Sequence, residues 1–499
     1  LSSLVQGALQ TEDTILPKFV PSTDEQLHET IHSIGELRHG VPRETGLHKT
    51  LMGGKAVSDA DGMAPAASCK YDPRLDPKFA SSDYSLIEQV NAAKYSTKMP
   101  NLPPIYGRVI SHNLTRVAPI GLIRPIPISD ILNAHKDYSH LSPMNLSTSP
   151  GFGFKGSDKR GLVTCSNLGW YEFNPAILDC GVSFEQLLYD KDAQLRSGVK
   201  VSAVSSSNLK DEVIPESKIY RKGAREIANW PCWLTLLMKK YYGAFVNSFI
   251  DSGFKSGCAL HMKFYGTDWN RLIAFLKSNS PNGLEFDLRA ADRIMSSQKC
   301  FTISDVIDKW YHNFGESSPQ DSFARRALME VICNRTMLTG RHVSNTIYGF
   351  ASGHWLTSAF QTISVWGDIM TGYILSMERS KAPLSFQGIS GAEDHFRLVQ
   401  HGDDSICSIS DEAAEYVNGR TIQEILLEYG IEVTSGSKSS VTGLLSDETT
   451  PVENLQFCSM YTTAHRYLDG KTEFWAALKP SSISKALKWS RGVNEVDLV

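Results

Sequence analysis

The spacing of hydrophobic and polar positions changes several times along the chain and predicts helices alternating with short strands. Residues 1–160 are rich in Pro and Gly and carry few long periodic stretches, which predicts irregular structure with short helices such as 24–37. Apolar positions at helical spacing predict helices over 232–250, 267–278, 303–337, 352–378 and 411–429, with Asp268 and Ser352 as candidate N-caps. Short apolar runs predict strands over 284–287, 396–400, 405–410 and 431–434. This order predicts an α+β domain in which a small antiparallel sheet packs on helices.

Composition narrows the class of protein. The chain of 499 residues is too long for one ordinary core and predicts roughly two to four subdomains. No run of 18 apolar residues occurs and the first residues do not resemble a secretory signal, so we expect no membrane span. The nine cysteines are scattered without a CxxC pair, which predicts free thiols and argues against a zinc site. A net charge of −4 disfavours a surface that is basic all over but permits an internal basic channel.

The segment HGDDS lies between two predicted strands, so Asp403 and Asp404 are expected at the tip of a hairpin. Gly402 supplies the permissive backbone that such a tight turn needs. Because Asp and Gly are also common in ordinary turns, a plain β-turn is the alternative interpretation.

A second acidic segment, LEFDLRAAD, places Asp287 at the end of an apolar strand and Asp292 five residues later. A carboxylate at the end of a buried strand is costly unless it is paired or bound to a metal. Carboxylates from two adjacent strands could hold two Mg²⁺ ions about 4 Å apart, an arrangement that serves in-line phosphoryl transfer. The alternative is that both acids pair with Arg289 or Arg293 on the surface.

A basic strip over 209–227, LKDEVIPESKIYRKGAREI, alternates in parts and suggests a hairpin. Its cations could contact the triphosphate of a nucleotide: Lys210, Lys218, Arg221, Lys222 and Arg225, with Lys200 upstream. The alternative is a solvated loop whose local partners are Asp211, Glu212 and Glu216.

Two glycine-containing loops complete the candidate chemistry. NLSTSPGFGFKG (145–156) could cradle a template phosphate with its backbone amides, or form an ordinary turn. SGHWLTSAF (352–360) could hold a nascent base pair and test the 2′-hydroxyl of the sugar, with Thr357 one turn into the following helix.

The order of these segments resembles that of the RNA-dependent RNA polymerases of RNA viruses, over roughly residues 60–495. The resemblance is strongest to the picornavirus-like supergroup, including caliciviruses and insect picorna-like viruses; a double-stranded RNA virus with such a polymerase fits the same order. In family terms TSPGF (148–152) is similar to motif G. The segment from Lys210 to Ile227 is similar to motif F. Asp287-x4-Asp292 is similar to motif A, Ser352-Gly353-x3-Thr357 to motif B, Gly402-Asp403-Asp404 to motif C, and YGIEVTSGSK, ending at Lys438, to motif D. The segments DPRL (72–75), SSI and KWSRG near 481–492 also resemble that supergroup.

The resemblance implies roles for these residues. Asp287 and Asp403 would be the principal ligands of two Mg²⁺ ions, for which Mn²⁺ could substitute, with Asp404 in support. Ribose recognition is implied for Asp292, Ser352, Gly353, Thr357 and Gln361. Triphosphate binding is implied for Lys218 and Arg225 within the basic strip, and proton donation to pyrophosphate for Lys438. Template contact is implied for Thr148, Ser149 and Gly151. On a C-terminal helix Lys485, Lys488 and Arg491 would face either the departing RNA or solvent.

Three motifs depart from the family pattern. Gln361 stands where motif B usually has Asn, and His401 where motif C usually begins with Tyr. Phe457-Cys458-Ser459-Met460 replaces the usual Phe-Leu-Lys-Arg of motif E. We therefore expect changes in the ribose network and in the contact with the primer.

The implied architecture is a closed right hand. Fingers would comprise 1–231 and an insertion at 256–283, the palm 232–255 and 284–464, and a short thumb 465–499. The implied activity is RNA-templated nucleotidyl transfer from ribonucleoside triphosphates. Expected partners are template and product RNA, together with a protein primer or with other viral replication or capsid proteins. The expected location is a replication complex in the host cytoplasm or a virion. One alternative function is a reverse transcriptase, against which the basic strip and Asp292 argue. Another is a non-catalytic RNA-binding scaffold, against which the presence of Asp287, Asp403 and Asp404 argues.

Overall fold

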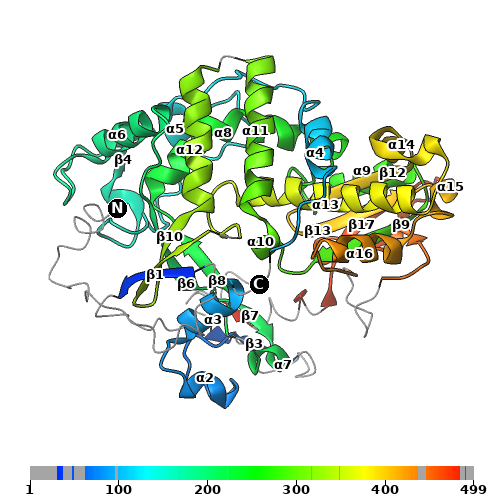
Figure 1. The fold of residues 1–499 in the computed structure, drawn as a ribbon, viewed down its shortest axis with the longest axis horizontal. Coiled ribbons are helices and arrows are strands. Elements are labelled where there is room, and N and C mark those ends of the chain that lie inside the picture. The colour runs from blue at the N-terminus through cyan, green and yellow to red at the C-terminus, as the bar shows by residue number, and fades with distance from the viewer. Residues whose placement is uncertain are drawn as a thin grey trace.

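A computed structural model of the chain describes residues 31–36, 48–49, 62–95, 99–167, 169–221, 223–315, 317–347, 349–435, 445–480, 482–483 and 489–490. The described residues divide into a helical region, a sheet with helices on both faces, and a second sheet with short helices below it (Figure 1).

The sheet that carries the Gly-Asp-Asp turn has the strand order β12-β13-β9-β14, and all its pairs are antiparallel. Its strands are β12 (Phe396–His401), β13 (Asp404–Ile409), β9 (Asn282–Leu288) and β14 (Val433–Thr434), and β15 (Thr450–Pro451) also pairs with β9. The prediction of strands at these four places is confirmed within a few residues.

Alternation along these strands sends side chains to two cores. Cys407 and Ile409 share one core with α13 (Thr357–Arg379) and α16 (Gly419–Glu428). Ile406 belongs to a core on the other face, with α9 (Asp268–Lys277). The predicted α+β fold, an antiparallel sheet flanked by helices, is therefore confirmed. Segment 256–283 was expected in the fingers; its helix α9 packs on this sheet, and the domain boundaries remain predictions.

The helical region is built on α8 (Cys232–Ser252), which is buried on nearly all sides, as a helix that is apolar all round should be. Beside it stand α11 (Ser297–Phe314) and α12 (Pro319–Cys333) (Figure 1). The helical character expected over 303–337 is confirmed for most of that span, which two helices cover, whereas its last residues belong to a strand. The chain leaves the first helix at Gly315, begins the second with a capping box between Ser318 and Asp321, and then enters a strand.

The second sheet has the order β1-β11-β10-β6-β8. Its strands are β1 (Ile31–Glu36), β11 (His342–Thr346), β10 (Arg335–Thr339), β6 (Val204–Leu209) and β8 (Glu226–Asn229), and only β10 and β6 pair in parallel. The helix expected over 24–37 is wrong for 31–36, because pairing with β11 makes that segment a strand; the rest of it lies outside the described residues.

The basic strip connects β6 to β8. These two strands pair antiparallel, so the predicted hairpin is confirmed where the strip begins and where it ends. The connection itself contains β7 (Val213–Pro215), paired with β3 (Met63–Pro65), and the short helix α7 (Glu216–Ile219).

The remaining α-helices are short, and the remaining strands form two-stranded antiparallel pairs. They are α2 (Pro77–Ser81), α3 (Leu86–Tyr95), α4 (Tyr106–Leu114), α5 (Ile128–Asn133), α6 (Phe184–Arg196), α10 (Ala291–Ile294), α14 (Gly388–His395), α15 (Asp411–Ala414), and the pairs β4 (Val163–Cys165) with β5 (Tyr171–Phe173), β16 (Met460–Arg466) with β17 (Thr472–Leu478) and β2 (His48–Lys49) with β18 (Trp489–Ser490). The helix expected over 411–429 is thus two helices, α15 and α16, separated by a new N-cap at Asn418.

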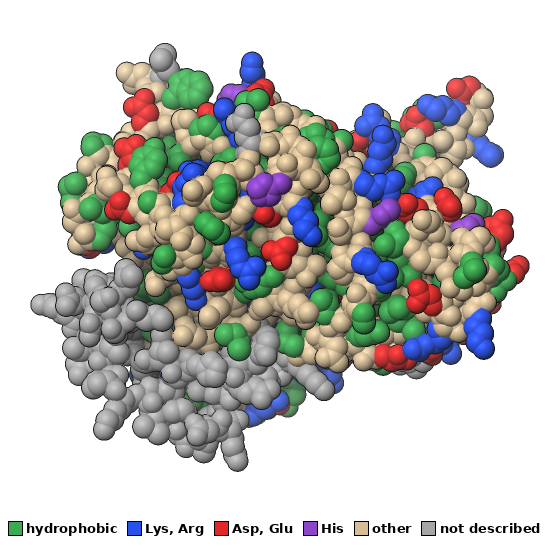
Figure 2. Space-filling view, turned by 45° about the horizontal axis from the view of Figure 1, so that its top comes forward, with side chains coloured by type: hydrophobic (Ala, Val, Ile, Leu, Met, Phe, Trp, Pro, Cys, Tyr) green, Lys and Arg blue, Asp and Glu red, His purple; other side chains and the backbone are tan. Residues whose placement is uncertain are grey.

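All nine cysteines are free, as the composition predicts. Among the described helices, none combines the length and hydrophobicity needed to span a bilayer. On the face in Figure 2, Lys and Arg side chains alternate with Asp and Glu instead of forming one basic surface, which agrees with the weakly acidic net charge.

Candidate active site

The Gly-Asp-Asp turn closes the β12–β13 hairpin, in which His401 pairs with Asp404. Gly402 has a φ of +62°, a conformation that residues with a side chain rarely adopt. The next pair of strands, β13 and β9, places Asp404 directly opposite Asp287. Two acids that are 117 positions apart in the sequence (404 minus 287) therefore become cross-strand neighbours.

Asp403 lies at the tip of the hairpin, where solvent reaches its side chain. Partial burial by surrounding protein is nevertheless the main cause that raises the pKa of its carboxyl; its own backbone amide lowers that pKa, Asp287 and Asp292 raise it, and Arg225 lowers it. The electrostatic influence of these residues shows that the acids of motifs A and C and the arginine of the basic strip converge on one place.

The donor set fits Mg²⁺ or Mn²⁺, because carboxylate oxygens are the ligands these hard cations prefer. Asp287, Asp403 and Asp404 would hold the ions. No three His, Cys, Asp or Glu side chains in the described part of the chain are already grouped as a metal site, so the carboxylates would have to turn toward an ion. A bound cation would also offset the repulsion by Asp287 and Asp292, which adds to the effect of burial in raising the pKa of Asp403.

The Ser-Gly loop of motif B packs against the strand that ends the basic strip. The backbone amide of Ala228 donates to the carbonyl of Ser352 at 3.2 Å. Gly353 has a φ of +98°, and a Cβ there would lie 2.0 Å from the carbonyl oxygen of Ala228, so only glycine fits. Ser352 is not the N-cap, because helix α13 begins at Thr357.

Motifs A and B also meet through the backbone. The amide of Phe350 donates to the carbonyl of Asp292 at 2.7 Å, which brings the Ser-Gly loop beside the second acid of motif A. Gln361, on the first turns of α13, has its Oε1 4.0 Å from the place where a Cβ on Gly402 would be. The structure thus puts Gln361 next to the Gly-Asp-Asp turn.

The loop similar to motif G is tied to the end of β8. Gly151 has a φ of +90°, and a Cβ there would lie 2.3 Å from the carbonyl oxygen of Trp230. The Asn229 amide donates to Ser149 Oγ at 2.8 Å, and the Cys232 backbone amide donates to Pro150 O at 2.8 Å.

Lys159, which the sequence analysis did not single out, secures the same loop. Its ammonium donates to the carbonyl oxygens of Asn145, at 3.3 Å, and Thr148, at 3.2 Å. It also donates to the Thr148 hydroxyl. The only signal in the sequence is a lysine shortly after the glycine loop.

The basic strip is partly paired within itself. Arg225 Nε lies 2.9 Å from Glu212 Oε1, so the local partner considered above is present, and this bond is the main cause that raises the pKa of Arg225. Asp403 and Asp292 raise it further, because these acids lie near the guanidinium. Lys218 and Arg221 are exposed, and the Lys210 amide bonds to the Arg225 carbonyl at 2.7 Å. Predicted site residues that lie outside the described residues are Lys222, Lys438, Lys485, Lys488 and Arg491.

Lys94 on α3 is a further residue that the sequence analysis missed. Its ammonium lies 2.8 Å from Asp292 and 2.9 Å from Glu226 of β8. Lys94 and Glu226 are almost fully buried, whereas Asp292 is partly exposed. Arg289 pairs with Glu432 at 2.6 Å, and the ion-pair partner of Asp292 is Lys94 and not one of the two arginines considered above. A lysine on the buried side of a short helix was the available signal.

The altered motifs C and E both border the acids. The imidazole of His401 packs on the ring of Phe264 at 5.8 Å, and burial lowers its pKa. Burial raises the pKa of the Cys458 thiol, and Asp404 and Asp403 raise it further, so the motif E turn lies close to them. Cys458 and Ser459 both have positive φ values, +51° and +60°, in the tight turn before β16.

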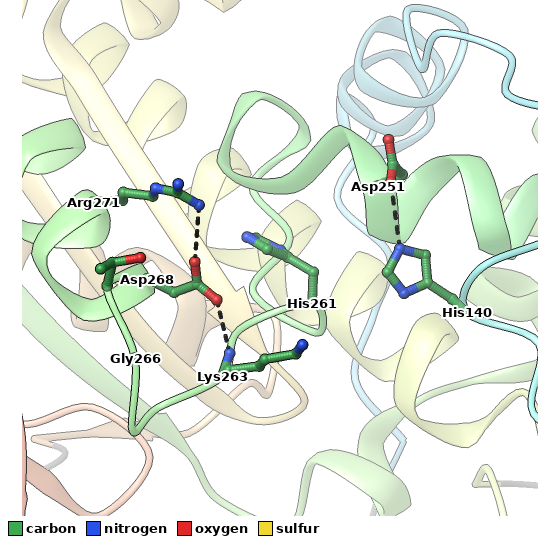
Figure 3. Close-up of a pocket in the computed structure, with 8 residues that line it drawn as sticks. His140, Asp251, His261, Lys263, Gly266, Asp268 and Arg271 are labelled. Carbon is green, nitrogen blue, oxygen red and sulfur yellow. Dashed lines mark hydrogen bonds and ion pairs between the residues drawn. The ribbon is translucent and has the colours of Figure 1, made fainter.

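A separate hollow of about 390 Å³ lies between the end of α8, the start of α9 and the loop after α8 (Figure 3). Asp268 is already bonded to Arg271 at 3.1 Å and to the Lys263 amide at 2.9 Å, and His140 faces Asp251 at 3.5 Å. Its acids are therefore paired with nearby side chains and backbone, and among the described residues neither Asp287, Asp403 nor Asp404 lines it.

An antiparallel sheet with acids on adjacent strands and helices on both faces is the arrangement found in the palm of a right-hand polymerase. The chain belongs to the viral RNA-dependent RNA polymerase family, whose model matches residues 63–499.

The relatives agree with this family. The replicase polyprotein of acute bee paralysis virus (strain Rothamsted) is 24% identical over 362 residues, which is 70% of this chain and 18% of the polyprotein. The RNA1 polyprotein of cowpea mosaic virus (strain SB) is 22% identical over 495 residues, 95% of this chain and 25% of that polyprotein. The chain thus spans a quarter or less of these relatives.

Among solved structures, a Sicinivirus 3Dpol RNA dependent RNA polymerase has the same fold, with a TM-score of 0.74 at 16% identity over 94% of this chain and 89% of that one. These matches support the picornavirus-like group that the motif order resembles.

Proposed function

We propose that this chain extends RNA by templated transfer of nucleotides from ribonucleoside triphosphates. The observation that carries the proposal is the pairing of Asp404 with Asp287, together with the electrostatic influence of Asp287, Asp292 and Arg225 on Asp403. In the reaction the primer 3′-hydroxyl forms a bond to the α-phosphate, and the bond to pyrophosphate breaks.

Different residues would serve metal binding, nucleotide binding and RNA binding. Asp287 and Asp403, with Asp404 in support, would hold two Mg²⁺ ions, which stabilise the attacking and leaving oxygens when bound. Arg225, with Lys210, Lys218, Arg221 and Lys222, would bind the triphosphate, and Lys438 would give a proton to pyrophosphate. Asp292, Ser352, Gly353, Thr357 and Gln361 would surround the ribose, and Thr148, Ser149 and Gly151 the template. Lys485, Lys488 and Arg491 would meet departing RNA.

We also propose the domain boundaries given above, with fingers at 1–231 and 256–283, palm at 232–255 and 284–464, and thumb at 465–499. The relatives are parts of viral polyproteins, which supports a role in genome replication or transcription. The proposed setting is a replication complex in the host cytoplasm or a virion, and the proposed partners are a protein primer or other viral proteins.

One assay tests the function. Purified protein is mixed with Mg²⁺, a homopolymer RNA template with a short primer, and labelled ribo- or deoxyribonucleotides. Incorporation of ribonucleotides is expected. A preference for deoxyribonucleotides would indicate a reverse transcriptase, and no incorporation of either would indicate a non-catalytic scaffold.

Replacing Lys94 with methionine is expected to weaken the choice of ribose over deoxyribose. The substitution removes the charged hydrogen bond that fixes Asp292, and such bonds contribute about 1.5–3 kcal/mol. The ratio of kcat/KM for ribo- over deoxyribonucleotide should therefore fall roughly tenfold or more. Steady-state incorporation of UTP and dUTP on a poly(A) template measures it.

Two variants serve as controls for this experiment. Lys94→Arg keeps the charge and should retain most of the discrimination. Lys78→Met, on the exposed helix α2, should change nothing. A Lys94→Met protein that folds and discriminates like the wild type would show that Lys94 has no part in sugar choice.

A further inference from the structure

Both backbone polar groups of Gly402 are bonded to buried side chains. The Gly402 amide donates to Thr362 Oγ1 at 2.9 Å, and the Gly402 carbonyl accepts from Gln400 Nε2 at 2.9 Å. Ser405 Oγ in turn donates to Gln400 Oε1 at 2.6 Å. Thr362, Gln400 and Ser405 are each no more than 2% exposed, so these bonds are shielded from water.

These bonds matter because of where the strand pairing ends. The β12–β13 ladder ends at His401 and Asp404, so Gly402 and Asp403 have no cross-strand partner. Gly402 is in a left-handed conformation, and a glycine is free to leave it. Without further contacts the turn, and with it the Asp403 carboxylate, would be loosely held.

Gln400 is itself fixed on its other side. Its backbone amide donates to the Gly257 carbonyl at 2.8 Å, and its carbonyl accepts from the Ala259 amide at 2.9 Å. The segment after α8 thus anchors the residue that holds Gly402. Thr362 belongs to α13, the helix that begins with Thr357 and also carries Gln361.

We propose that Thr362, Gln400 and Ser405 are positioning residues that lock the Gly-Asp-Asp turn and tie it to the helix at the ribose side of the site. The inference rests on the proposed function and names residues to which that function assigns no role. A displacement of about 1 Å at a reacting centre can lower a rate by about 100-fold, so loss of this lock should reduce turnover more than nucleotide binding.

The first test replaces Thr362 with valine, which keeps the shape and removes the hydroxyl. We expect kcat to fall roughly 10- to 100-fold, KM for the nucleotide to change less than about threefold, and the Mg²⁺ concentration for half-maximal rate to rise. Thr362→Ser restores the hydroxyl and should restore most of the rate. A merely structural role would not move the Mg²⁺ requirement.

A matched control lies on the same helix. Thr371 is buried, and its hydroxyl has no hydrogen-bond partner among the described residues. Thr371→Val removes the same atoms without touching the turn, and should leave kcat and the Mg²⁺ requirement unchanged. A loss equal to that of Thr362→Val would overturn the proposal.

Ser405→Ala provides a second test that leaves Thr362 in place. It removes only the hydroxyl that orients Gln400, and should raise the Mg²⁺ requirement and lower kcat by a smaller factor than Thr362→Val. Combined with Thr362→Val it should be non-additive, because both act on the same glycine. This variant decides the question if Thr362→Val does not fold: an unchanged kcat and Mg²⁺ requirement would overturn the lock.

The two proposals fail in different ways. If the wild-type protein is inactive, the proposed polymerase function is contradicted. If the wild-type protein is active and the folded Thr362→Val and Ser405→Ala variants have the wild-type kcat and Mg²⁺ requirement, only the positioning role of these residues is contradicted.

Discussion

Asp403→Ala is expected to abolish RNA synthesis while RNA binding stays close to that of the wild type. The carboxylate would hold the metal ions, and those ions contribute several kcal/mol of transition-state stabilisation. Since each 1.36 kcal/mol is tenfold in rate, the loss should be roughly 1,000-fold or more. Primer extension measures the rate, and fluorescence anisotropy of a labelled primer–template measures binding.

The matched control is Asp411→Asn. Asp411 is exposed in α15, beyond the other end of β13, and should tolerate loss of its charge with an unchanged rate. The catalytic assignment of Asp403 fails if its alanine variant elongates RNA at the wild-type rate. Equal loss of RNA binding would instead show that the variant no longer folds or that Asp403 serves the RNA directly.

Lys299→Met is expected to destabilise the protein by about 3–5 kcal/mol, because it leaves a buried carboxylate without its partner. Lys299 of α11 and Asp368 of α13 form an ion pair at 2.6 Å, and both side chains are 1% exposed. The pair joins the helical region to the helix of motif B. Urea denaturation followed by fluorescence should give a lower midpoint.

The pH dependence of this variant follows from Asp368. Burial raises the pKa of its carboxyl, and Lys299 lowers it, so removing the lysine lets the pKa rise further. A carboxyl whose pKa is higher in the folded than in the unfolded state adds stability at pH values below its unfolded-state pKa. This contribution is lost as the pH rises through the folded-state pKa. The deficit of Lys299→Met should therefore be larger at pH 8 than at pH 5.5.

Two further variants separate charge from packing. Lys299→Met combined with Asp368→Asn removes both charges and should recover part of the loss. Lys309→Met changes an exposed lysine of the same helix and should have little effect. A Lys299→Met midpoint equal to that of Lys309→Met would show that the buried pair does not stabilise the fold.

The features that the sequence predicted well depend on local pattern. The β12–β13 hairpin follows from two short apolar runs around Gly402, and α8 from a long apolar helix. The elements that were wrong depend on distant partners or on breaks. Residues 31–36 form a strand because they pair with β11, and the helix expected over 411–429 is interrupted before the N-cap at Asn418.

The site divides in the same way. The acids could be named because their spacing matches a known order of motifs. Lys94 could not, because its contact with Asp292 joins residues 198 positions apart (292 minus 94), and its one local signal, a lysine on the buried side of a helix, does not indicate which residue it contacts. Ser352 was misjudged as an N-cap for a related reason: the close approach of Gly353 to Ala228 keeps the chain out of a helix until Thr357.

The parallel pairing of β6 with β10 has a consequence for how the chain acquires its structure during synthesis. β6 and β8 lie near residues 204–229, but β10, the neighbour that joins them to the rest of their sheet, lies at 335–339. About a hundred more residues must leave the ribosome before that sheet can be completed, and contacts so distant in sequence form slowly. We therefore expect the basic strip to emerge on an unfinished sheet with an open edge, which makes this stage of translation the one most exposed to aggregation and to chaperone binding.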